Sequence, residues 1–246
     1  MGVPKLKLIF GTKLKGAPVK LVTELYLERS RRILALGLFG RVALEAFRIS
    51  LEKPKSELSS LISKMCDHLP NHYLENRKIQ NKEYKLVSFV DSQSLIVMIS
   101  EVEGFIQDLL IAILCRHPDM LGNSQIETSK LLELGDIDLA VQHLAEKRVN
   151  KIMYQKPNDY KKGIISVLSI DEGLLDDTWS AYVEAKARRD LGVHNSWKVD
   201  DDYLRKVKDA GLPAPKSSDY EYFISAKENA LGLMGLLYEH CGKKFS

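Results

Sequence analysis

A long amphipathic helix is the feature of this sequence that most constrains its fold. Between residues 91 and 116, hydrophobic side chains recur every three or four positions, which is the period of one face of an α-helix. Asp91 is a plausible N-cap, and the pattern ends near Arg116. The apolar face consists of Leu95, Met98, Val102, Phe105, Ile106, Leu109 and Ile113. Because such a face must be buried, we predict that other helices pack on it.

Further helical patterns follow this helix, and strand patterns are scarce. The last pattern opens with Ser218-x-x-Glu221, which has the form of a capping box. The predicted helices are one opening at Asp136 or Asp138, then 175–193, 200–210 and 218–240, while residues 155–172 stay unassigned. We therefore predict an all-α helical bundle for this part of the chain.

The first 88 residues read differently. Residues 1–23 suggest a short strand or a mobile arm, residues 24–50 a helix, and residues 70–85 a polar linker. A shorter helix lies between that first helix and Pro70. We predict two parts: a small, basic, mostly helical N-terminal element of unknown role over 1–88, and a helical domain over 89–246.

Charge is distributed unevenly between these parts. Residues 1–90 carry a net charge of +9 and residues 91–246 one of −6, which gives +3 for the whole chain. A basic N-terminal third could attract the phosphates of RNA. The alternative is an ordinary solvated surface.

Composition limits the compartment and the cofactors. Three widely spaced cysteines indicate neither a disulfide framework nor a zinc ribbon, so a reducing cytoplasmic location fits best. We see no signal-peptide layout, and the early apolar run at 33–40 is too short to cross a membrane. His68 and His72 have metal-ligand spacing, but Pro70 breaks the helix that would align them. Without a phosphate-binding loop either, we expect no metal and no cofactor.

The stretch most suggestive of chemistry ends the helix predicted over 175–193. It reads Ala187-Arg188-Arg189-Asp190-Leu191-Gly192-Val193-His194-Asn195. An Arg can hold a phosphate and a His can move a proton near neutral pH, so the pair can process a phosphodiester without a metal. The bare spacing is not evidence, since about 0.3 Arg-x4-His matches are expected by chance in this composition.

Helical geometry separates the two key residues. Five positions turn an ideal helix by about 500°, which leaves Arg189 and His194 roughly 140° apart. Asp190 lies four positions before His194 and could orient its imidazole. Gly192 weakens the helix, so we expect His194 in a frayed or ending last turn. The alternative for the whole segment is a solvated helix end with ordinary ion pairs.

The chemistry also favours two copies of the chain. A metal-free ribonuclease needs one group to accept the 2′-OH proton, one to protonate the leaving oxygen and a cation on the phosphate. One motif supplies a single His, whereas a symmetric dimer that brings two motifs face to face supplies both proton-transfer groups. We therefore expect a homodimer.

The stretch 188–195 resembles the signature of HEPN domains, an Arg followed by a polar residue and then by a His four to six positions after the Arg. It is most similar to the branch found in RNA-processing and phage-defence systems, with a downstream Asp202-Tyr203-Leu204. The segment 101–110 is similar to that branch's first long helix. The resemblance covers roughly residues 91–240 and leaves 1–88 outside.

This resemblance implies a dimeric all-α bundle and a metal-independent endoribonuclease that leaves a 2′,3′-cyclic phosphate. It implies that Arg189 binds the phosphate, His194 transfers the proton and Asp190 is the polar motif residue, with Arg188 and Asn195 in support. Gly192 departs from the pattern, where a bulkier apolar residue is usual. RNA and an antitoxin or other defence protein are the implied partners. A non-catalytic interaction or nucleotide-binding module is the alternative.

Overall fold

Every element in the described part of the chain is helical, which confirms the predicted all-α class. The computed structural model describes residues 22–36, 42, 46, 57, 60, 83–209 and 220–245. After a helix at 22–36 come α5 (Glu83–Arg116), η1 (Pro118–Leu121), α6 (Thr128–Leu134), α7 (Ile137–Met153), α8 (Pro157–Leu168), η2 (Glu172–Leu175), α9 (Asp176–His194), α10 (Asp201–Asp209) and α11 (Tyr220–Lys244).

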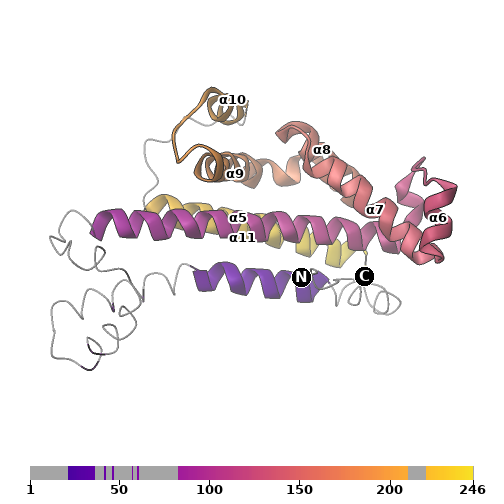
Figure 1. Cartoon of the computed structure of the whole chain (residues 1–246), viewed down its shortest axis with the longest axis horizontal. Helices are drawn as coiled ribbons and strands as arrows, with labels where there is room; N and C mark the ends of the chain where they lie inside the picture. The colour runs from indigo at the N-terminus through magenta and orange to yellow at the C-terminus, as the bar shows by residue number, and fades with distance from the viewer. Residues whose placement is uncertain are drawn as a thin grey trace.

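Helix α5 is the axis of the fold. It has 34 residues, hence a length of about 50 Å, and it packs against α7, α8, α9 and α11. The seven side chains of its predicted apolar face are all at most 2% exposed. Figure 1 shows α5 and α11 running through the middle, with the helix at 22–36 on one side and α7, α8, α9 and α10 on the other.

Helix α5 begins earlier than predicted. Its first residue is Glu83, so Asp91 lies inside the helix and not at its N-cap, and 83–85 are not linker. Residues 83–90 contain neither Gly nor Pro, so nothing in them stops the helix from continuing. The predicted division after residue 88 therefore falls within α5.

The helix at 22–36 shares the core of the later helices. Val22 and Ile33 are 3% and 0% exposed and belong to the same hydrophobic cluster as α5 and α11. Tyr26 stacks on Tyr238 with ring centroids 4.5 Å apart, and the hydroxyl groups of Thr23 and Tyr238 are 3.2 Å apart. This part of the predicted N-terminal element is thus packed directly on the bundle. The remaining predictions for 1–88, the basic arm included, lie outside the described residues.

The predicted helix caps and helix ranges after residue 116 can be compared with the structure. Asp136 caps α7, because its side chain accepts a 2.7 Å hydrogen bond from the Asp138 amide. The unassigned segment contains α8, which starts with Pro157 at a position that suits proline. Helices α9 and α10 match their predicted ranges within one residue at each end. The capping box at Ser218 lies outside the described residues.

Within the described ranges, none of the helices combines the length and the apolar content that crossing a membrane requires.

Candidate functional site

The Arg–His stretch occupies the last two turns of α9. The helix continues through Gly192 and ends at His194, so His194 lies in an ending turn as predicted. Asn195 caps it: its backbone amide donates to the Leu191 carbonyl over 2.9 Å. Its side-chain amide donates to the Lys198 carbonyl and to Asp200, over 2.8 and 3.2 Å. Asn195 therefore fixes the turn that follows His194.

Arg189 faces α5 and is held by an acid there. Its guanidinium forms an ion pair with Glu103, and its Nε lies 3.4 Å from Asp190. The Arg189 side chain is 17% exposed, so one edge of it is accessible. A phosphate that bound Arg189 would compete with the Glu103 carboxylate, since both offer oxygen acceptors to the same fork of donors.

Lys186 pairs with the same carboxylate as Arg189, that of Glu103. It lies one turn earlier on α9. Burial lowers the pKa of Lys186 to about 8, and the positive charge of Arg189 acts in the same direction. Lys186 therefore loses its proton at a lower pH than a solvent-exposed lysine does. Neither Glu103 nor Lys186 was predicted from the sequence to belong to the site. The three-residue spacing of Lys186 and Arg189 was the available signal for the lysine.

Asp190 points toward α10. Its carboxylate lies 3.4 Å from Lys206, and Lys206 also pairs with Asp202 at 2.8 Å. His194 is exposed. Among the interactions of the described residues, the expected contact between Asp190 and His194 does not occur; Arg189 and Lys206 take its place. Asp190 thus joins α9 to α10.

Arg188 is buried on another side of α9. It is 5% exposed, its Nε donates to Glu184 over 2.8 Å, and its guanidinium lies 3.7 Å from the ring centre of Tyr222. Glu184 also accepts from the hydroxyl groups of Tyr203, over 2.8 Å, and Tyr222. This network joins α9 to α10 and α11, so Arg188 supports the site by fixing its helix.

Gly192 is where the loop after α9 folds back. A Cβ at this position would lie 2.4 Å from Cζ2 of Trp197. The Trp197 amide donates to the Leu191 carbonyl over 3.0 Å, and Ser196 and Trp197 adopt positive φ angles of 50° and 64°. The indole therefore covers Gly192 directly. This contact gives a structural reason for a glycine at this position of α9.

Helix α10 packs against the last turns of α9. Ala187 and Leu191 of α9 form a small buried cluster with Tyr203 and Val207 of α10. Beside this cluster, apolar side chains remain exposed: Val193 is 49% exposed, Val199 54% and Leu204 43%. The end of α9 thus offers an exposed imidazole with hydrophobic groups close to it in the sequence.

Arg189 and His194 do not converge within one chain. The Arg189 side chain binds Glu103 on α5, whereas His194 is exposed after the helix has turned by about a further 140°. No group of three or more His, Cys, Asp or Glu side chains suited to a metal ion occurs among the described residues, and His68 and His72 are not among them.

In comparisons with protein-family models, curated proteins and solved structures, nothing matched this chain.

Proposed function

We propose that this protein is a HEPN-type endoribonuclease that works as a homodimer without a metal, as a toxin of a toxin–antitoxin pair or in anti-phage defence in the cytoplasm. The exposed His194 at the end of α9, one and a half turns beyond an arginine that is already positioned, is the observation that carries the proposal. A proton-transfer group must be accessible, and a phosphate-binding cation must be held in place.

The two chains divide the reaction between them. One His194 accepts the 2′-OH proton while the 2′ oxygen attacks the phosphorus. The bond from phosphorus to the 5′ oxygen breaks, and the second His194 protonates that leaving oxygen. Arg189 compensates the charge that grows on the phosphate. The products are a 2′,3′-cyclic phosphate end and a 5′-hydroxyl end.

The position of His194 supports a two-chain site. Its imidazole is exposed, and Val193 beside it is 49% exposed. Placing two α9 ends together would cover this hydrophobic surface and bring the second imidazole that a single chain lacks.

A second candidate function is a non-catalytic interaction module. The ion pair between Arg189 and Glu103 favours it, because a phosphate has to displace an acid that already occupies the guanidinium. In that case the charged end of α9 serves only to shape a contact between chains.

An RNA-cleavage assay in EDTA separates the two candidates. We expect the full chain to cut RNA and to leave 2′,3′-cyclic phosphate ends. His194→Ala and Arg189→Ala should each lower the rate by about 10²–10⁴-fold, the usual contribution of such a group. An inert parent chain, or equal cutting by His194→Ala, would contradict the nuclease function.

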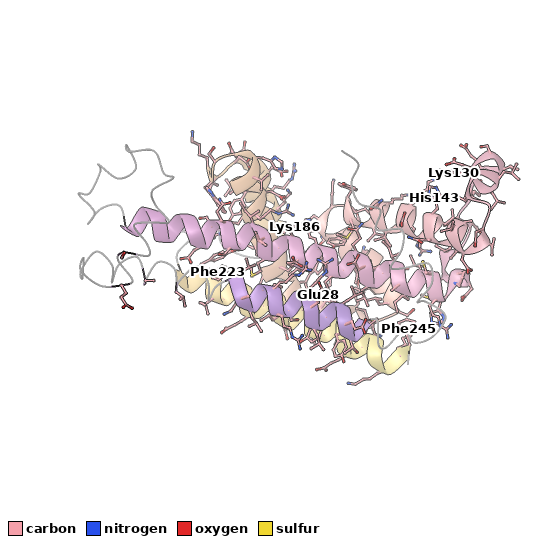
Figure 2. All side chains as sticks on the ribbon, turned by 60° about the horizontal axis from the view of Figure 1, so that its bottom comes forward. Glu28, Lys130, His143, Lys186, Phe223 and Phe245 are labelled. Carbon is pink, nitrogen blue, oxygen red and sulfur yellow. The ribbon has the colours of Figure 1, made fainter. Side chains whose placement is uncertain are left out.

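The chain offers matched controls for both substitutions. His143 on α7 and Arg116 at the end of α5 belong to other parts of the bundle, and Figure 2 shows His143 near the end that carries α6. His143→Ala and Arg116→Ala should cut at the parent rate. Lys186→Gln tests whether the lysine, rather than His194, moves the proton.

A further inference from the structure

A basic cavity lies away from the Arg–His stretch, between α7, α8 and the segment after η1. Its volume is about 600 Å³. Helix α7 approaches α8 closely beside it, since a Cβ on Gly163 would lie 2.6 Å from Cγ2 of Ile152. The charged side chains in its wall are Lys147, Arg148, Lys151, Asp159 and Lys162.

The charged side chains that line this cavity are mostly cationic. Four cationic side chains face one carboxylate, that of Asp159. Lys147 and Lys151 lie one turn apart on α7, and Lys162 comes from α8, so the cations approach from two helices. None of these three lysines forms an ion pair with any residue in the described ranges, whereas Lys130 and Lys161 each do. Lysines around a cavity that have no paired carboxylate favour the binding of an anion there.

The other lining groups indicate which kind of anion. Amide side chains, such as those of Asn123, Gln125 and Gln155, can donate hydrogen bonds to phosphate oxygens. None of the lining residues among those described is aromatic, so a nucleobase finds no ring on which to stack. Pockets for free small molecules usually combine apolar with aromatic groups, and the apolar side chains here (Leu121, Leu144 and Ile152) have no aromatic neighbour among the described lining residues. The wall therefore suits a chain of phosphates rather than a base.

Two of the helices that line the cavity, α7 and α8, lie on the same side of α5 as α9. Helices α7, α8, α9 and α10 all lie on the side of α5 opposite to the helix at 22–36 (Figure 1).

We infer that this cavity, centred on Lys147, Lys151 and Lys162, binds the sugar–phosphate backbone of RNA outside the reacting site. The choice of RNA as the ligand rests on the proposed function. Contacts of this kind hold and align a strand without reading its sequence.

Salt-dependent RNA binding tests the inference without requiring cleavage. The probe is a fluorescent single-stranded RNA, and the protein is the full chain with His194→Ala. Each lysine contact to a single-stranded phosphate contributes about 0.7 to the slope of log affinity against log salt. Adding K147A, K151A and K162A together should reduce that slope by about 2 and weaken binding roughly ten- to hundredfold at 0.1 M salt.

A matched triple variant controls for the loss of charge. Lys130→Ala, Lys227→Ala and Lys243→Ala together remove the same charge at positions outside the cavity, and they should leave the slope unchanged. Poly(U) and poly(A) should respond equally to the cavity variant, because phosphate contacts carry no sequence information. Equal slopes for the two triple variants would overturn the inference. So would ATP binding that depends on the three cavity lysines and displaces the RNA, since the cavity would then be a compact nucleotide site.

The experiments distinguish failure of the proposed RNA-binding role of the cavity from failure of the proposed nuclease activity. If the parent chain never cuts RNA but the cavity variant still lowers the slope, the cavity inference stands and the nuclease function falls. If the parent cuts and the cavity variant binds and cuts equally well, only the cavity inference falls. With both correct, the cavity variant raises KM and leaves kcat near the parent value.

Discussion

Arg188 and Arg189 are neighbours in the sequence, yet they contact different helices. Arg188 is buried against Glu184 and the Tyr222 ring, whereas Arg189 pairs with Glu103 and is 17% exposed. Because α9 turns by about 100° per residue, two adjacent side chains cannot share a face. One guanidinium is therefore buried in the scaffold, whereas the other is partly exposed and paired with Glu103.

Alanine at each arginine should separate these tasks. Arg188→Ala leaves the Glu184 charge buried without its cation, so we expect a loss of about 3–5 kcal/mol in the free energy of unfolding. Arg189→Ala should cost about 1 kcal/mol or less, because Lys186 still pairs with Glu103. Urea unfolding of both variants measures the difference. Equal losses would show that both arginines are structural.

Gly192 gives a second prediction at the scale of one residue. An added methyl group at 2.4 Å from Trp197 forces the indole and its loop to move, and overpacking of this kind costs about 1–3 kcal/mol. Gly192→Ala should therefore be less stable than the parent chain. The control is Gly242→Ala in α11, where an added Cβ has nothing within 4 Å and helix propensity should stabilise by up to about 1 kcal/mol. Thermal unfolding of the pair checks this prediction, and similar shifts in both variants would contradict it.

The helix at 22–36 can be tested through two adjacent side chains. Ile33 is 0% exposed and Leu34 is 52% exposed. Ile33→Ala should lower the free energy of unfolding by about 2–5 kcal/mol, because it leaves a cavity in the shared core. Leu34→Ala should change it by less than about 0.5 kcal/mol. If the two variants unfold alike, this helix does not pack on α5 and α11 in solution.

The elements that could be predicted from sequence are those with a local signal. The apolar period of α5 and the cap at Asp136 depend on residues a few positions apart, so local rules suffice for them. The true start of α5 carries no such signal, since propensity alone continues the helix back to Glu83. Helix α8 was left open because Gly163 counts against a helix locally, whereas the close approach of Ile152 accounts for it in the fold.

In the candidate site, too, the features with a local signal could be predicted and the long-range contacts could not. The position of His194 at a helix end was predicted from Gly192, two residues before it. The partner of Arg189 could not be predicted, because Glu103 lies 86 positions away and meets it only when α5 packs on α9. Asp190 was assigned to His194 from its spacing, yet Lys206 from α10 is its partner instead. Long-range packing decides such pairs.

At the scale of the whole molecule, the proposed composite site requires two chains. Light scattering at micromolar concentration should give the mass of a dimer, about twice 27.9 kDa. If each cut needs both His194 side chains, an equal mixture of parent and His194→Ala chains, after subunit exchange, should retain about a quarter of the parent activity at equal total concentration. About one half would show that each chain works alone, and a monomeric mass would rule out the shared site.

The contact between the helix at 22–36 and α11 has a consequence for protein synthesis. Thr23 and Tyr238 are 215 positions apart, yet their hydroxyl groups meet. During translation at about 5–20 residues per second, the early helix therefore waits roughly 10–40 s for the segment that covers it. Throughout that time the side chains of Val22 and Ile33 lack part of their final burial. The nascent chain therefore exposes this apolar surface until α11 has been synthesised and can pack on it.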